Sequence, residues 1–188
     1  MALITLLEVF YLVVASLVVG YIFSGYIKRP SKDVLDQYVK GFDWEDLKFA
    51  TMIAAPGIVL HELAHKFVAM GFGLNAVFEI WPTGLIVGVI LKLLGIGFML
   101  LAPGYVSISG LSDPFANFLT SFAGPAMNLI LWLGAAYVSK TSKNLTRDQA
   151  VGLHLLALMN KWLFVFNMIP IPPLDGFSVF SSLYHLLF

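Results

Sequence analysis

The stretch FATMIAAPGIVLHELAHKFVAMGF, residues 49–72, combines the length of a membrane helix with polar side chains in its second half. A helix needs about 20 mostly apolar residues to cross the hydrocarbon of a bilayer, and this stretch is longer than that. His61, Glu62 and His65 stand inside it. A charged side chain in mid-bilayer costs at least about 2.5–3.5 kcal/mol, and such residues usually mark function. We therefore predict a membrane helix that carries a functional centre.

The composition of the whole chain also indicates a membrane protein. Of its 188 residues, 59% are hydrophobic and 12% are charged, whereas a soluble domain has about 25% charged residues. A chain this short cannot bury so much apolar surface by itself, so the lipid bilayer is a predicted partner. The formal net charge is zero, which provides no basic field for nucleic acid. Cysteine is absent, so any metal site must use His, Asp or Glu.

Apolar runs on both sides of residues 49–72 predict an all-α polytopic membrane protein with about four transmembrane helices. We expect one domain over residues 1–188, with a first span at 1–27, an interfacial segment at 28–48, the span at 49–72, a re-entrant segment at 74–112, a span at 115–138 and a broken span at 150–188. The alternative has five spans, with residues 85–101 crossing the bilayer. A re-entrant segment is favoured because the spans at 49–72 and 150–188 then run in the same direction.

The spacing of the two histidines predicts a metal site. His61 and His65 are four residues apart, so on a helix their imidazoles lie on one face, about 6 Å apart along the axis. Two nitrogens so placed can hold one zinc ion at about 2.0–2.1 Å each. Glu62 is rotated by about 100° from His61. A carboxylate beside the metal can accept a proton from water, as in other HExxH sites.

Zinc in a catalytic site needs a third protein ligand, and several acidic or histidine residues are available. The candidates are Glu79, Asp113, His154, Asp175 and His185. Asp175 is preferred because the prolines before it interrupt helical hydrogen bonding. Lipid tolerates such backbone only where it lines protein or a wet cavity, so this acidic residue is expected to face inward. The alternative is an ordinary turn at a span end with a solvated aspartate.

Three motifs in order along the chain resemble the site-2 protease family of intramembrane zinc metalloproteases. These are HELAH at 61–65, SFAGPAMN at 121–128 and NMIPIPPLDG at 167–176. The first motif occurs in many metalloproteases, whereas the third is much more specific. The chain resembles a minimal form of the family, without PDZ or CBS domains.

This resemblance implies a ligand set, a reaction and a local fold. One Zn²⁺ per chain would be held by His61, His65 and Asp175, with Glu62 as the general base. The substrates would be transmembrane proteins cleaved within or next to their spans. A short β-sheet would follow the HExxH span, and residues 76–81 and 98–108 are its expected strands. The protein would be an integral, multi-pass membrane protein, and the cell membrane is its expected location.

Two asparagines are candidate donors to the substrate backbone or to the oxyanion of the reaction. They are Asn128, in the AGPAMN stretch, and Asn167, which opens the NMIPIPPLDG stretch. Hydrogen bonds between helices are an equal alternative for each of them. Lys66 is expected to extend toward the membrane surface rather than to act at the site.

Other functions and the orientation stay open at this point. The alternatives to proteolysis are a zinc-containing protein that binds transmembrane helices without hydrolysis, and a metal carrier; a homo-oligomer is also open. Residues 28–48 and 139–149 hold five and three Lys or Arg residues. The positive-inside rule makes their side cytoplasmic, whereas the family resemblance places the opening of the site in the cytosol.

Overall fold

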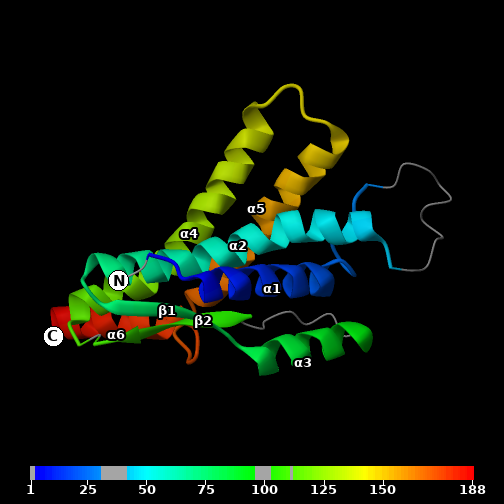
Figure 1. Cartoon of the computed structure of the whole chain (residues 1–188). Coiled ribbons are helices and arrows are strands. Elements are labelled where there is room, and N and C mark those ends of the chain that lie inside the picture. The colour runs from blue at the N-terminus through cyan, green and yellow to red at the C-terminus, as the bar shows by residue number, and fades with distance from the viewer. Residues whose placement is uncertain (1–2, 31–41, 96–102, 111) are drawn as a thin grey trace.

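The computed structural model describes residues 3–30, 42–95, 103–110 and 112–188 of the chain, and these residues are mostly helical. Four long helices account for most of it (Figure 1): α1 (Leu6–Phe23), α2 (Trp44–Gly71), α4 (Pro114–Thr141) and α5 (Arg147–Asn167). A short helix α3 (Pro82–Leu93) and a C-terminal helix α6 (Asp175–Leu187) complete the helical part. Helix α2 is central, because it packs against α1, α4, α5 and both strands.

Each long helix begins at a side chain that accepts a backbone hydrogen bond of the first turn. Thr5 and Thr146 form capping boxes with Glu8 and Gln149 at the starts of α1 and α5. Asp43 caps α2, and Asp113 caps α4 in the same way. Such caps satisfy backbone N–H groups that have no partner inside the helix.

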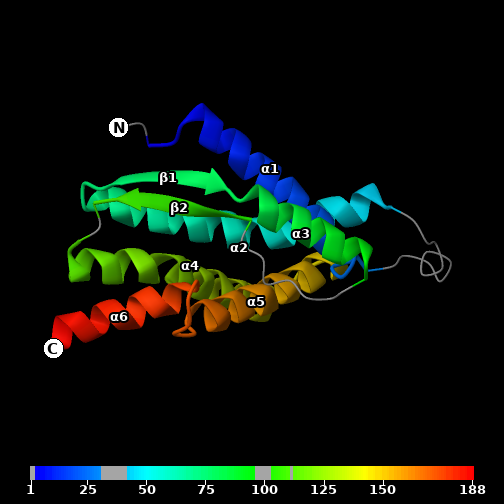
Figure 2. The same cartoon turned by 90° about the horizontal axis from the view of Figure 1, so that it is seen from below.

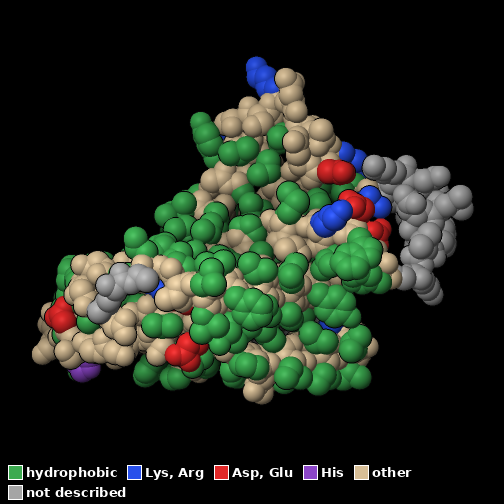
Figure 3. Space-filling model, in the orientation of Figure 1, with side chains coloured by type: hydrophobic (Ala, Val, Ile, Leu, Met, Phe, Trp, Pro, Cys, Tyr) green, Lys and Arg blue, Asp and Glu red, His purple; other side chains and the backbone are tan. Residues whose placement is uncertain are grey.

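The four long helices are apolar enough to cross a membrane by length and composition, and they are the only such helices among the described residues. Many large apolar side chains on them are exposed to their surroundings. Figure 3 shows hydrophobic side chains over much of the visible face, while several charged ones gather where α1 ends and α2 begins. Helices α2 and α5 run in the same direction (Figure 1), as the four-span arrangement requires.

A two-stranded antiparallel sheet follows α2. Strand β1 (Asn75–Ile80) pairs with β2 (Gly104–Ser109), and Phe78 of β1 faces Val106 of β2. The strands run alongside α2 (Figure 2). The first strand was expected at 76–81. The second begins later than the expected 98–108, and residues 98–102 lie outside the described part of the chain.

Helix α3 stands between the two strands, where the sequence suggested either a fifth span or a re-entrant segment. It has 12 residues, which is about 18 Å of helix, whereas the hydrocarbon layer is about 30 Å thick. The described residues therefore contain four helices of membrane-spanning length, and α3 is not one of them. Lys92 near the end of α3 lies over the Tyr21 ring and donates hydrogen bonds to the Tyr21 carbonyl and the Ser24 hydroxyl, which fixes α3 against α1.

The predicted interfacial segment at 28–48 falls largely on residues 31–41, which lie outside the described residues. Residues 44–48 form the first turn of α2, so this helix begins five residues before the expected span. Arg29 bridges to the start of α2 through ion pairs with Asp43 and Asp46, at 3.2 and 3.8 Å. The broken span at 150–188 consists of α5, a turn region and α6.

Candidate metal centre

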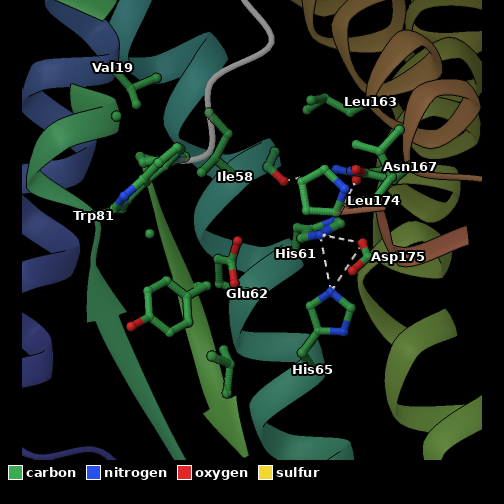
Figure 4. Close-up of a pocket in the computed structure, with 18 of the residues that line it drawn as sticks. Val19, Ile58, His61, Glu62, His65, Trp81, Leu163, Asn167, Leu174 and Asp175 are labelled. Atoms are coloured by element: carbon green, nitrogen blue, oxygen red, sulfur yellow. Dashed lines mark hydrogen bonds and ion pairs between the residues drawn. The ribbon is translucent and has the colours of Figure 1, made fainter. Parts of the chain in front are cut away.

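Three side chains from two distant segments converge on one point. His61 and His65 lie on α2, and Asp175 is the first residue of α6. Nε2 of His61 lies 3.1 Å from Oδ2 of Asp175, and Nε2 of His65 lies 3.4 Å from the same oxygen. The two Nε2 atoms are 3.1 Å apart (Figure 4). These residues form the single group of this kind among the described residues that could hold a metal ion. The structure thus brings together the three ligands that the resemblance implied.

The three ligand atoms match the geometry of a tetrahedral zinc ion. Ligand atoms about 2.0–2.2 Å from such an ion lie about 3.3–3.5 Å from one another. The observed separations of 3.1, 3.1 and 3.4 Å are close to that spacing. Two imidazoles and one carboxylate are also a donor set that zinc takes in catalytic sites. The residues present therefore fit the ion.

The other ring nitrogen of each histidine is held by a group far away in the sequence. Nδ1 of His65 contacts the backbone oxygen of Thr120 at 2.7 Å, and Nδ1 of His61 contacts Oδ1 of Asn128 at 2.7 Å. A carbonyl oxygen can only accept, so each Nδ1 carries the proton. Each Nε2 therefore has a free lone pair directed at the metal position, which is the usual outer-shell arrangement of zinc-binding histidines.

The orientation of the Asn128 amide follows from a chain of hydrogen bonds. Asn160 on α5 donates through Nδ2 to the Leu156 carbonyl, so its oxygen faces Asn128. Nδ2 of Asn128 then donates to that oxygen at 2.9 Å and to the Gly57 carbonyl at 2.8 Å. Oδ1 of Asn128 is therefore free to accept the hydrogen bond from Nδ1 of His61. Both asparagines are fully buried, so this network fixes the His61 ring from α5.

Gly124 on α4 explains part of the AGPAMN stretch. A Cβ atom at this position would lie 2.2 Å from Nε2 of His65 and 2.7 Å from Nε2 of His61. Any side chain there would occupy the position of the metal. Only glycine lets α4 approach α2 closely enough for Asn128 and Thr120 to reach the two rings.

The proline-rich break before α6 directs Asp175 toward α2. Short turns, such as the hydrogen bond from the Leu174 N–H to the Ile171 carbonyl, replace helical hydrogen bonds between the last residue of α5 and the first of α6. Gly176 lies against this break, because a Cβ there would be 2.5 Å from the Met168 carbonyl carbon. The NMIPIPPLDG stretch thus interrupts the helix between α5 and α6 and places its aspartate at the metal position.

A cavity of about 440 Å³ opens beside the three ligands. It is lined by residues of α1, α2, α3, β2, α4 and the end of α5, and by the turn that leads into α6. Figure 4 shows the Glu62 carboxyl group beside His61, on the side of α2 that faces the strands. The Glu62 side chain has no hydrogen bond to any described residue. Its carboxylate is thus buried in the fold but available to water or substrate in the cavity.

The two candidate asparagines have different surroundings. Asn128 uses both ends of its amide inside the protein, as described above. Asn167, the last residue of α5, lines the cavity, and its side chain has no hydrogen bond to another described residue. A role toward substrate or oxyanion stays a prediction for both, and the contacts favour Asn167.

The remaining candidate ligands lie away from the metal position. Asp113 caps α4 and Glu79 accepts a hydrogen bond from the Tyr105 hydroxyl at 2.9 Å. That hydrogen bond raises the pKa of Tyr105. His154 and His185 are exposed on α5 and α6. Among the described residues, none of these four side chains joins His61 and His65 in a group that could hold a metal ion.

Sequence reasoning missed several contacts around the site. The Thr120 carbonyl has no signature in the sequence, and Asn160 stands with Lys161 in an otherwise mostly apolar run, where nothing indicates its partner. The expectation for Lys66 was wrong: its side chain is buried and forms an ion pair with Glu8 of α1. A buried carboxylate within reach holds the ammonium inside the fold, so it does not extend to the surface.

Comparison with known proteins gives three named relatives. A protein of Methanocaldococcus jannaschii named "Putative zinc metalloprotease MJ0611" is 37% identical over 127 residues, 65% of this chain and 64% of the relative. The Synechocystis protein "Putative zinc metalloprotease sll0528" is 30% identical over 144 residues, 76% of this chain and 33% of the relative. The Bacillus subtilis protein "Putative zinc metalloprotease YwhC" is 31% identical over 150 residues, 66% of this chain and 64% of the relative.

The alignments therefore cover just under two thirds of two relatives and one third of the other. No family model matches the chain. No solved structure matches it either. The similarity thus connects the chain with proteins named as zinc metalloproteases.

Proposed function

We propose that this protein is an intramembrane zinc metalloprotease of the site-2 type, which hydrolyses peptide bonds within or next to transmembrane segments. The convergence of His61, His65 and Asp175 beside Glu62, which has no hydrogen bond to a described side chain, carries this proposal. The names of the three relatives and the four apolar helices support it. The helices would cross the bilayer, and the reaction would take place at membrane depth.

One zinc ion would be held by His61, His65 and Asp175. When bound, zinc lowers the pKa of a water molecule and polarises a peptide carbonyl. Glu62 accepts a proton from the attacking water molecule as the water oxygen bonds to the carbonyl carbon. Glu62 then delivers this proton to the leaving nitrogen as the carbon–nitrogen bond breaks. Asn128 and the Thr120 carbonyl keep the two rings oriented throughout.

The substrate would bind as an extended segment. A transmembrane helix hides its carbonyl groups in internal hydrogen bonds, so it must unwind before it can react. Gly104, Val106 and Ile108 of β2 line the same cavity as Glu62. An unwound segment can add to the edge of this strand, with main-chain hydrogen bonds holding the scissile bond in place. Asn167, which lines the cavity, would donate a hydrogen bond to a carbonyl group of the substrate segment.

The test uses the purified full chain in detergent and in liposomes. Zinc is quantified per chain, and the protein is then incubated with a single-span reporter, with and without a chelator. We expect one zinc per chain, cleavage that stops with the chelator, and recovery when zinc is returned. Glu62→Gln is the matched control, which is expected to bind zinc without cleaving. Full cleavage by that variant, or by the metal-free protein, would refute the proposal. Zinc without cleavage of any reporter would favour a non-hydrolytic protein or a carrier.

A further inference from the structure

Two buried charged residues lie outside the metal centre and take no part in the chemistry described above. Glu8 on α1 and Lys66 on α2 are each 2% exposed and form an ion pair. Buried ionisable groups in an apolar helical bundle are costly and rarely lack a role. Lys66 directly follows the ligand His65 in the chain, so the pair lies on the helix that carries the site.

The Glu8 carboxylate accepts hydrogen bonds from four donors. Oε1 accepts from the Lys66 ammonium and from the Phe78 backbone N–H, the latter at 2.9 Å. Oε2 accepts from the N–H and the hydroxyl of Thr5, at 2.8 and 2.9 Å. An ionised carboxylate has about four acceptor positions, so this group is saturated. A single side chain thereby connects α1, α2 and β1.

The Phe78 contact shows which edge of the sheet Glu8 holds. In an antiparallel pair, facing residues alternate between those that exchange backbone hydrogen bonds and those that do not. Phe78 faces Val106, and its N–H points to Glu8 instead of β2. The backbone polar groups of Val106 therefore point away from β1. They face outward on the edge of β2 that pairs with no described strand, and Val106 lines the cavity with Glu62.

We infer that Glu8 is a positioning residue that fixes the sheet from its β1 edge and so sets the place of the substrate-binding edge of β2. This inference rests on the proposed function. A two-stranded sheet has little stability of its own and needs outside support. Without the carboxylate, the Phe78 N–H would be buried and unpaired, and the sheet would shift to satisfy it. Lys66 neutralises the Glu8 charge, which would otherwise be buried alone.

The test compares three variants that all lack the ammonium, and the two double variants decide the result because neither of them holds a buried unpaired charge. Lys66→Met alone leaves the Glu8 contacts with Phe78 and Thr5 in place. Adding Glu8→Gln keeps a neutral acceptor for the Phe78 N–H, whereas adding Glu8→Leu removes it. Each variant is measured for zinc affinity by chelator competition, for KM and kcat on the reporter, and for hydrogen exchange of residues 75–80 and 104–109.

We expect equal zinc affinity in all three variants. KM should stay within about twofold of the wild-type value for Lys66→Met with Glu8→Gln, and rise by about tenfold or more for Lys66→Met with Glu8→Leu, because one buried N–H loses its partner. Hydrogen exchange of β1 and β2 should quicken in the Glu8→Leu variant alone, while exchange of α4 and α5 stays the same. A merely structural role would change all of these together.

The inference is overturned if the Glu8→Leu and Glu8→Gln variants share the same KM and the same exchange. It is also overturned if Glu8→Leu loses zinc, since the pair would then serve the metal centre. If Glu8→Leu does not fold, it is replaced by Glu8→Asp in the same Lys66→Met background, which shortens the side chain by one methylene. The same changes in KM and in hydrogen exchange are then expected of this variant. If the wild type cleaves no reporter, the proposed function fails, and the exchange measurement still decides whether Glu8 anchors the sheet.

Discussion

Gly124→Ala places a methyl group in the metal position, and its effect can be derived from the structure. The new Cβ would lie 2.2 Å from Nε2 of His65. Real Cβ atoms essentially never come closer than 3.0 Å to another heavy atom, so the ring or α4 must move by about 0.8 Å. Zinc ligand distances vary by only about 0.2 Å. The change therefore removes at least one ligand from the tripod.

We expect the zinc affinity of Gly124→Ala to fall by at least about 100-fold, the upper end of what outer-shell changes cause. The assay is competition with a chelating dye in detergent, with thermal unfolding measured in parallel. Gly134→Ala is the matched control on the same helix, because nothing lies within 4 Å of its Cβ position. That variant should bind zinc normally and gain about 0.5–1 kcal/mol of stability. Wild-type zinc affinity in Gly124→Ala would refute the proposed packing of α4 against the site.

Three further predictions concern the surroundings of the ligands. Asn128→Leu leaves the His61 Nδ1–H without an acceptor and should lower zinc affinity by about 10–100-fold; a value equal to wild type would show that the amide does not orient the ring. Asn160→Leu removes one of the two acceptors of the Asn128 amide, so its loss of zinc affinity should be smaller, and a larger loss would contradict the order of the network. Zinc binds the folded state, so a chelator should lower the unfolding temperature. The loss of stability is about 2.7 kcal/mol relative to a sample with free zinc at 100 times its Kd. An unchanged unfolding temperature would mean that no ion is held.

The core of the site could be predicted because its signals are local. Helical spacing alone places His61 and His65 on one face, with Glu62 beside them. The prolines before Asp175 identify the one acidic residue that follows a forced break in an apolar run. These features depend on residues within a few positions of each other, so they need no knowledge of how the helices pack.

The contacts that orient these residues could not be predicted in the same way. The Thr120 carbonyl is a backbone group, and backbone groups leave no mark in a sequence. Glu8 and Lys66 are 58 positions apart, and only packing of α1 on α2 brings them together. Lys66 was expected to reach the surface because a lone lysine in an apolar helix usually does so.

The segment after α2 was predicted only in outline. Glycines between residues 84 and 97 argued against a helix there, yet Pro82 at the first helical position starts α3. The strand at Asn75–Ile80 lies within one residue of the expected 76–81, which the family resemblance had implied. The second strand is short, and its position depends on pairing with β1 rather than on its own composition.

The most direct test of the metal centre is X-ray absorption at the zinc edge, measured on the purified wild type and on Asp175→Ala. The structure leads us to expect one zinc per chain with two imidazole nitrogens from α2 and one carboxylate oxygen from α6. In Asp175→Ala the spectrum should lose the carboxylate oxygen together with the scattering of its carboxyl carbon, or the zinc content should fall to zero. A zinc shell that stays the same when Asp175 is replaced would contradict the central claim that α2 and α6 hold one ion between them.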